Sequence, residues 1–338
     1  MKKERASTAL LALVVAVVCA TVASTSAQSP AFPNRAASSR ADRATSKWTV
    51  PRTPWGDPDL QGLWPSIDMQ GTPYERPPEL AGKAVLNDEE FAARTAAQGT
   101  RPRGWGERGI PSRQASLVVE PADGRLPPLT AEGQRRFGTA RSTYYLDFPD
   151  VVVHHPFDNF DDLGPYDRCI TRGVLASMLP TAYNMGNEIF QIPGYVIIRN
   201  EMIHETRSIP LDGRPHLNGR IRQYMGDSRG RWEGDTLVIE TTNFNGKVGL
   251  TRNGNTAPTS RDLRLLERLT RIDADTIQYE ATVEDPQIWV RSWKVALPLK
   301  QHPEYGMFEY ACHEGNYAMK NILSAARSDE KTAGAASK

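Results

Sequence analysis

The chain has 338 residues, with 41 Lys and Arg against 40 Asp and Glu, a formal net charge of +1. So balanced a charge gives no electrostatic basis for holding nucleic acid or an anionic lipid surface, and neither is expected as a partner. The 25 prolines and 26 glycines predict a structure rich in turns.

Residues 1–27 have the features of a secretory signal peptide. A short basic start precedes an apolar run over residues 9–23, which is too short to span a membrane. Small residues offer a cleavage site after Ala27. We therefore expect a periplasmic or secreted protein with no membrane attachment after cleavage.

The rest of the chain divides by composition. Residues 28–52 are rich in Ser, Ala, Arg and Pro with almost no apolar periodicity, which predicts a flexible leader. Residues 53–326 are long enough for one large β domain or two smaller domains. We favour one domain, made of a wrap over residues 53–187 and strands over residues 188–314, followed by a disordered tail over residues 327–338.

Two segments of the wrap predict helices between proline-rich connections. In residues 87–98, Asn87 can cap a helix and Glu90 can complete a capping box. Residues 130–141 predict a second helix, capped by Thr130.

From residue 188 the pattern changes to alternating polar and apolar residues, in segments separated by Gly, Asp and Asn. Such segments, with no long helix between them, predict antiparallel strands. Because a curled sheet loses its exposed edges, the sequence predicts a mainly β fold, an antiparallel lipocalin-like β-barrel with a helix-containing, proline-rich wrap. The predicted strands lie over residues 194–210, 221–225, 234–244, 263–273, 275–285, 288–300 and 307–314.

Alternation along these strands assigns side chains to faces. Over residues 197–207 it places Arg199 and Arg207 toward water, and it places Asn200 and His204 inward. An inward imidazole is a candidate for acid–base chemistry.

Two charged residues fall on otherwise apolar faces. Glu267 lies among leucines, and Arg291 alternates with Trp289 and Trp293. Because buried charges are costly without partners, Glu267 and Arg291 either neutralise each other or hold a ligand. The tryptophans and Tyr279 on the neighbouring strand are either ordinary core or the walls of a pocket.

Residues 226–230, Gly-Asp-Ser-Arg-Gly, match the G-x-S-x-G pattern that presents a catalytic serine in many hydrolases. That motif needs a helix after the serine, and here a strand-like segment follows. We therefore expect Ser228 in a loop before a hairpin whose turn is Gly234-Asp235.

Three histidines, His204, His216 and His313, could converge on a metal ion from different strands. None of them belongs to a spacing typical of metal sites. We expect no metal and no cofactor, with this set of histidines as the alternative.

Cys169 and Cys312 remain after removal of the signal peptide, and in an oxidising compartment they can form one disulfide. Two separate buried thiols are the alternative. Arg172 either anchors its loop through carbonyl hydrogen bonds or binds an anionic substrate. A disulfide would bring together the candidate binding residues on both sides, Asp167, Arg172, His313 and Glu314.

Several long blocks of the sequence resemble those of a group of exported bacterial proteins. They are PDLQGLW, ERPPELAGK, YDRCITRG, PLDGRPH, GDSRGRWEGDTLVIETTNF and YACHEGNYAM, and they extend from about residue 53 to the C-terminal end. The resemblance implies secretion and one shared fold, and it lends no activity. Gly62-Leu63-Trp64 is also similar to the G-x-W of lipocalins.

These features predict an exported enzyme that performs hydrolysis, elimination or isomerisation by acid–base chemistry on a small or carbohydrate-like molecule. His204 and Glu267 would exchange the proton. The alternative is a lipocalin-like protein that binds the molecule without reaction, and the sequence assigns no oligomeric state. The candidate binding residues are Arg291, Asn200, Trp289, Trp293, Tyr279, Arg172, Asp167, His313 and Glu314.

Overall fold

The computed structural model describes residues 48–99, 107, 109–139, 157–250 and 257–336. The predicted signal peptide and most of the predicted leader, residues 1–47, lie outside the described residues. Residues 48–52 of the predicted leader belong to the same compact unit as the strands, and Val50 is buried.

The strands form two antiparallel sheets, which confirms a mainly β antiparallel fold. The four-stranded sheet contains, in spatial order, β1 (Gly62–Leu63), β3 (Asn187–Ile192), β4 (Tyr195–Asn200) and β5 (Thr206–Pro210). The six-stranded sheet contains, in spatial order, β2 (Val118–Glu120), β10 (Trp293–Lys300), β9 (Thr276–Glu284), β8 (Arg264–Arg271), β7 (Thr236–Thr242) and β6 (Asp227–Glu233).

Four described α-helices lie between or after the strands along the sequence. Among the described residues, no helix is long and apolar enough to cross a membrane. The four helices are α2 (Asp88–Gly99), α3 (Ala131–Thr139), α4 (Val174–Met178) and α5 (Ala318–Ala336). Short 3-10 turns are η1 (Ile67–Met69), η2 (Pro78–Leu80), η3 (Phe160–Asp162) and η4 (Met202–His204).

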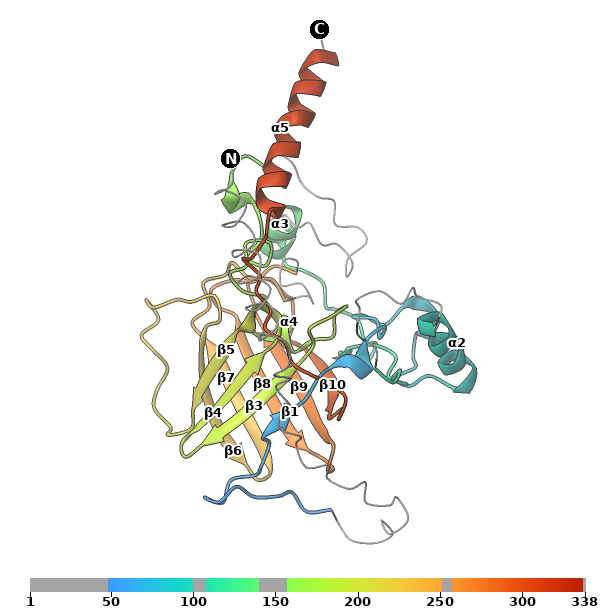
Figure 1. Ribbon diagram of the computed structural model, residues 1–338, viewed down its shortest axis with the longest axis vertical. Helices are drawn as coiled ribbons and strands as arrows, with labels where there is room; N and C mark the ends of the chain where they lie inside the picture. The colour runs from blue at the N-terminus through green and yellow to red at the C-terminus, as the bar shows by residue number, and fades with distance from the viewer. Residues whose placement is uncertain (1–47, 100–106, 108, 140–156, 251–256, 337–338) are drawn as a thin grey trace, which may run out of the picture. The chain divides into compact units, whose positions relative to one another are not determined.

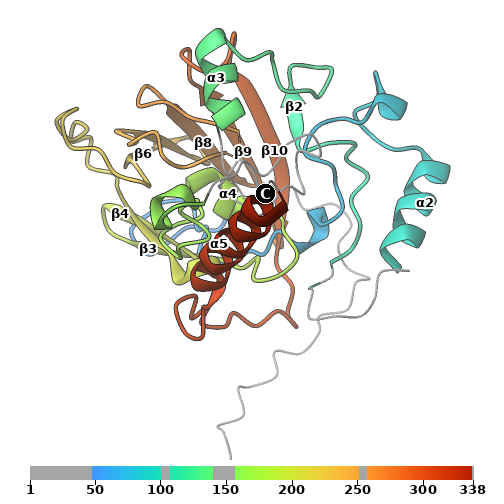
Figure 2. The same ribbon diagram turned by 90° about the horizontal axis from the view of Figure 1, so that it is seen from above.

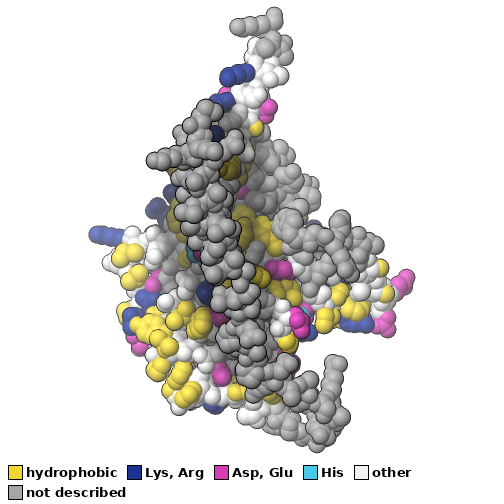
Figure 3. Space-filling model, in the orientation of Figure 1, with side chains coloured by type: hydrophobic (Ala, Val, Ile, Leu, Met, Phe, Trp, Pro, Cys, Tyr) yellow, Lys and Arg dark blue, Asp and Glu magenta, His cyan; other side chains and the backbone are white. Residues whose placement is uncertain are grey.

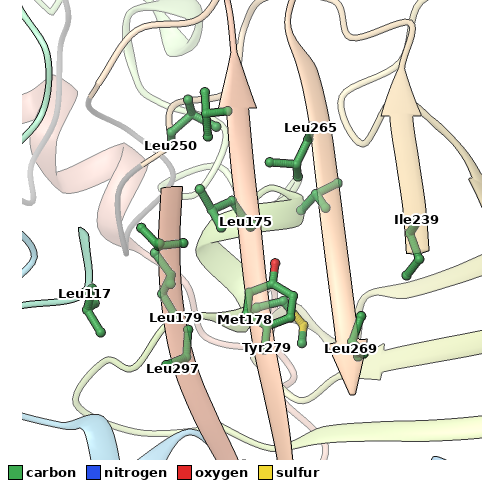
Figure 4. Packing of buried hydrophobic residues seen from close by; sticks show 14 of the residues in the cluster. Leu117, Leu175, Met178, Leu179, Ile239, Leu250, Leu265, Leu269, Tyr279 and Leu297 are labelled. Atoms are coloured by element: carbon green, nitrogen blue, oxygen red, sulfur yellow. The ribbon is translucent and has the colours of Figure 1, made fainter. Parts of the chain in front are cut away.

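The main core lies between the two sheets, which face each other in Figures 1 and 2. Figure 4 shows the inner face of the six-stranded sheet, where Leu265, Leu269 and Tyr279 point toward side chains of the buried helix α4. Ile198 and Ile209 of the four-stranded sheet belong to the same buried cluster. Alternate residues of each strand therefore bury one face, as the period of two predicts.

The predicted closed barrel is not found among the described strands. β5 and β6 contact each other, but no ladder of hydrogen bonds joins them, so the two sheets remain separate and pack face to face. The hairpin between β6 and β7 does form, and its turn contains Gly234 at a φ of +61° and Asp235. A Gly at positive φ in the first turn position is typical of a tight hairpin.

The predicted strand over residues 194–210 breaks in the middle. η4 interrupts it with two residues in the left-handed region, Ile203 at a φ of +59° and His204 at +44°. The break shifts the alternation by one residue, so Arg207 is buried and Thr206 is exposed. The predicted outward Arg207 and inward His204 are both wrong, because a 3-10 turn does not keep a period of two.

Both predicted helix starts are confirmed. The Asn87 side chain accepts the Glu90 N–H at 2.9 Å, and the Glu90 carboxylate accepts the Asn87 N–H at 2.9 Å. The Thr130 hydroxyl accepts the Gly133 N–H at 3.0 Å at the start of α3.

Three segments differ from prediction. Helix α5 runs through the predicted disordered tail as far as Ala336, and its apolar residues pack against Phe157 and Leu163. Residues 307–314 form no strand, and residues 221–225 contribute one isolated bridge, from Gln223 to Phe244.

The outer face of the four-stranded sheet carries exposed apolar side chains. Phe190 and Ile192 are 41% and 50% exposed, and hydrophobic side chains gather over β3 and β4 in Figure 3. The opposite face of the same strands is buried in the core, so the outer face alone meets solvent.

Candidate functional site

Glu267 is buried in an ion pair with Arg207, and not with Arg291, which the sequence offered as its partner in one of two alternatives. Two Arg207 nitrogens donate to the Glu267 carboxylate at 2.7 and 2.9 Å, and the Tyr279 hydroxyl donates to it at 3.0 Å. Arg207 comes from β5 and Glu267 from β8, so the pair joins the two sheets across the core. Burial acts to lower the pKa of Arg207, but the Glu267 carboxylate outweighs it and the pKa is raised.

The residues predicted to line a pocket with Glu267 do not do so. Arg291 is exposed, because it lies in the turn before β10 rather than in the strand. Trp289 and Trp293 are buried and pack edge to face, with ring centroids 5.6 Å apart. Asn200 is buried too, and its amide donates to the Asn187 side chain at 2.7 Å. These aromatic and amide groups belong to the core.

The predicted disulfide is present. Cys169 and Cys312 are bonded, with Cα atoms 5.7 Å apart. Nearby, Arg172 is fully buried, and the Asp167 carboxylate accepts the Gly164 N–H at 3.2 Å within its own loop. The remaining two residues of this predicted group, His313 and Glu314, are exposed on the other side of the bond.

The three histidines of the metal alternative have different surroundings. His216 lies between two carboxylates, 3.0 Å from Asp227 and 3.3 Å from Glu240. Within the described ranges, no group of three or more His, Cys, Asp or Glu side chains is placed to hold a metal ion.

Ser228 lies inside strand β6 rather than in the loop predicted for it. Its hydroxyl is buried and lies 2.9 Å from the Thr241 hydroxyl on β7. A serine paired within a hairpin has neither the sharp turn nor the following helix of a nucleophile elbow.

A cavity of about 360 Å³ lies beside η4. It contains an imidazole, a guanidinium and carboxylates within one small volume, together with apolar side chains. The residues that line it are Arg199, Glu201, His204, Met307, Phe308 and Glu309.

His204 is exposed at this cavity, and one of its ring nitrogens is fixed by the backbone. Nδ1 lies 2.9 Å from the Tyr310 carbonyl oxygen, which can only accept a hydrogen bond. Nδ1 therefore carries the proton, and Nε2 has the lone pair when the ring is neutral. The structure thus presents a histidine base at the cavity, although the predicted partner Glu267 is in the core.

Glu201 also lines the cavity, and its side chain is buried. Its carboxylate accepts hydrogen bonds from the Asn184 amide at 3.0 Å, the Gly186 N–H at 3.1 Å and the Phe308 N–H at 2.9 Å. A Cβ on Gly186 would lie 2.8 Å from the same carboxylate, so only glycine fits that close approach.

A shared phenol connects Glu201 to a second carboxyl group. The Tyr305 oxygen lies 2.7 Å from Glu201 and 2.8 Å from Glu107, and it accepts the Met185 N–H at 2.9 Å. A phenol has one proton and can donate to only one of the two. Burial raises the pKa of Glu107, which favours its protonated form relative to a carboxyl group in water.

Burial and the bond to Glu201 also raise the pKa of Tyr305, so its hydroxyl keeps its own proton. The three groups form a hydrogen-bonded line from Glu107 through Tyr305 to Glu201, with Glu201 at the cavity. No sequence pattern indicates this line, because strand alternation places Glu201 on the solvent face and no motif connects it to residues 107 and 305.

Glu107→Gln is expected to remove a pH dependence from folding. Because the pKa of Glu107 is raised in the folded protein, its stabilising contribution is complete below the unfolded pKa of about 4.3 and is lost as pH rises through the folded pKa. Gln mimics the protonated form, so the variant should equal wild type in stability near pH 4 and be the more stable of the two at neutral pH. Urea unfolding at several pH values measures this difference.

Glu314→Gln is the matched control, because Glu314 is exposed and should show no such divergence. If the Glu107→Gln and wild-type stabilities run parallel from pH 4 to pH 8, the pKa of Glu107 is not raised in the folded protein.

No protein-family model, curated protein or solved structure matches the chain.

Proposed function

We propose that this protein is an exported enzyme that performs acid–base chemistry on a small molecule in the cavity beside η4. His204 acts as the base, and Glu201 supplies a proton through Tyr305 and Glu107. The observation that carries the proposal is the Tyr305 oxygen within hydrogen-bond distance of two carboxyl groups, which provides a path for a proton between Glu107 and Glu201 beside the cavity that His204 lines.

The role of His204 is supported by its hydrogen bonding. The Tyr310 carbonyl fixes the proton on Nδ1, and among the described residues Nε2 has no hydrogen-bond partner. An imidazole in this tautomer can accept a proton at Nε2, as a general base must.

The role of Glu201 is supported by its place in the hydrogen-bonded line. Transfer of one proton from Glu107 to Tyr305, and of the phenol proton to Glu201, leaves Glu107 ionised and Glu201 protonated. Glu201 then returns a proton to the substrate, while His204 has taken one from it. A base and a proton donor on one cavity suit isomerisation or elimination.

The remaining lining residues suggest a substrate with an apolar face and polar substituents. Phe308 is 74% exposed and offers a flat ring, and Arg199 lies at the same cavity and forms an ion pair with Glu188. A carbohydrate-like molecule has both features, since its ring carbons pack on aromatic faces and its hydroxyls meet charged groups.

Backbone strain at the site supports the same location. Ile203 is a β-branched residue in the left-handed region, a conformation that costs on the order of 1–3 kcal/mol and occurs most often at functional sites. Here the strained turn positions His204 at the cavity.

Export is supported by two independent features. The first 27 residues have the pattern of a signal peptide, and the Cys169–Cys312 disulfide is typical of oxidising compartments.

The test measures the exchange of substrate hydrogens for deuterium and the formation of products. It therefore needs no prior choice between isomerisation and elimination. The protein is incubated in D2O with a panel of sugars, sugar acids and lactones, and proton NMR records loss of C–H signals and new products. His204→Ala is expected to lower the rate by about 10²–10⁴ with ligand affinity kept. His313→Ala is the matched control, because that histidine is exposed and does not line the cavity.

The competing function is ligand binding without reaction. Loss of affinity in His204→Ala, with no exchange or product in the wild type, would assign a binding protein. Turnover that is unchanged in His204→Ala would remove the histidine from the mechanism and overturn the proposal.

A further inference from the structure

A second cavity, of about 610 Å³, lies away from the residues of the proposed acid–base site. Its charged and phenolic walls come from α3, the loop after η3 and the segments on either side of β6 and β7. They are Arg136, Asp161, Asp162, Arg168, Tyr224 and Lys247.

The two acidic residues of this cavity accept hydrogen bonds from their own loop. Asp162 accepts the N–H groups of Asp158 and Asn159 at 2.7 and 3.1 Å. Asp161 accepts one Arg168 nitrogen at 3.0 Å. These bonds hold the η3 turn and offset the negative charge locally.

Arg168 and Lys247 have N–H donors that the carboxylates of Asp161 and Asp162 do not occupy. One Arg168 nitrogen donates a hydrogen bond to Asp161. The Arg168 guanidinium lies 5.4 Å from the centroid of the Phe160 ring, and the side chain is 17% exposed. Lys247 is exposed, and no carboxylate in the described part of the chain lies within ion-pair distance of it. A guanidinium and an ammonium at one cavity provide donors of the kind that bind carboxylates.

Part of the lining of this cavity is apolar and adjoins the core. Tyr224, Val248 and Gly249 also line a narrow crevice of about 10 Å³ that leads toward the core. Its other walls are apolar side chains, including Leu175, Phe244 and Leu263. An occupant with an apolar part would therefore bury that part against Tyr224 and Val248 while its charged group meets the cations.

We propose that this cavity binds an organic carboxylate with an apolar body, held by Arg168 and Lys247 at the charged end. The site shares no residue with the cavity lined by His204, so it is independent of the proposed reaction.

Isothermal titration calorimetry of the full chain tests the proposal with benzoate, its neutral analogue benzamide, and inorganic phosphate. Benzoate is expected to bind saturably, with benzamide and phosphate each at least tenfold weaker, because each lacks one of the two features. Benzamide binding as tightly as benzoate would show that charge plays no part, and phosphate binding as tightly would show that the apolar part of the lining plays none. Either result overturns the proposal.

Lys247→Gln is expected to weaken benzoate binding about fivefold or more, because the exposed lysine can change without disturbing the fold. Lys331→Gln, an exposed lysine near the end of α5, is the control and should leave the affinity unchanged. Binding that both variants keep in full would place the benzoate elsewhere and contradict the assignment, as would the absence of any measurable heat with benzoate.

Discussion

Glu267→Ala is expected to lower the free energy of unfolding by about 3–5 kcal/mol. The substitution leaves the Arg207 guanidinium in the core with its bidentate partner gone, and the hydroxyl of Tyr279 loses its acceptor. An uncompensated buried charge is far costlier than the loss of an exposed ion pair. Urea unfolding followed by tryptophan fluorescence measures the change.

Two further variants separate the effect of the buried charge from other effects. Arg207→Met combined with Glu267→Leu should lie within about 1–2 kcal/mol of wild type, because no unpaired charge remains. Glu233→Ala, which breaks an exposed pair with Arg268, should cost less than about 1 kcal/mol. If the double variant is as unstable as Glu267→Ala, then lost packing and not an unpaired charge explains the result.

The folded double variant also tests the corrected role of Glu267. Because this carboxylate lies in the core and lines neither described cavity, the double variant should keep the turnover and the ligand affinity of the wild type. The same variant would lose turnover if the sequence-based pairing of His204 with Glu267 were the chemistry.

Removal of the disulfide is expected to have the second large effect. Cys169→Ala with Cys312→Ala releases a closure between residues 143 apart in sequence. Such a loss costs about 2–5 kcal/mol, chiefly because the unfolded chain gains conformational freedom. For a chain of this size that corresponds to a fall in Tm of roughly 5–15 °C.

Thermal unfolding with and without dithiothreitol provides the internal control. The reductant should lower the Tm of the wild type toward that of the double variant and leave the variant itself unchanged. Equal melting temperatures for wild type and variant under oxidising conditions would mean that the bond adds nothing to stability.

Sequence periodicity located the strands whose surroundings are regular. Ile277, Tyr279 and Val283 alternate as predicted and are buried, and the inward position of Glu267 followed from its apolar neighbours. The partner of Glu267 could not be found in this way, because it depends on η4 shifting the alternation before Arg207. A single turn with two left-handed residues leaves no signal in hydrophobic periodicity.

The candidate site was only partly accessible to sequence reasoning. His204 was selected as an inward residue of a continuous strand, and it lies at the cavity for a different reason, the break in that strand. The line from Glu107 to Tyr305 joins segments nearly 200 residues apart, by bonds from side chains in irregular structure. Sequence patterns within one segment do not indicate that two distant segments are in contact.

The edges of the two sheets bear on how the protein behaves when many copies are crowded together. Unpaired strand edges recruit other chains, and long, flat, apolar ones are the most hazardous. Here the outer edges are β1 and β2, of two and three residues, while β5 and β6 lie beside each other. β6 also carries Arg229, Arg231 and Glu233 along its length. Among the described strands, the sheets therefore offer little backbone on which a second copy could polymerise.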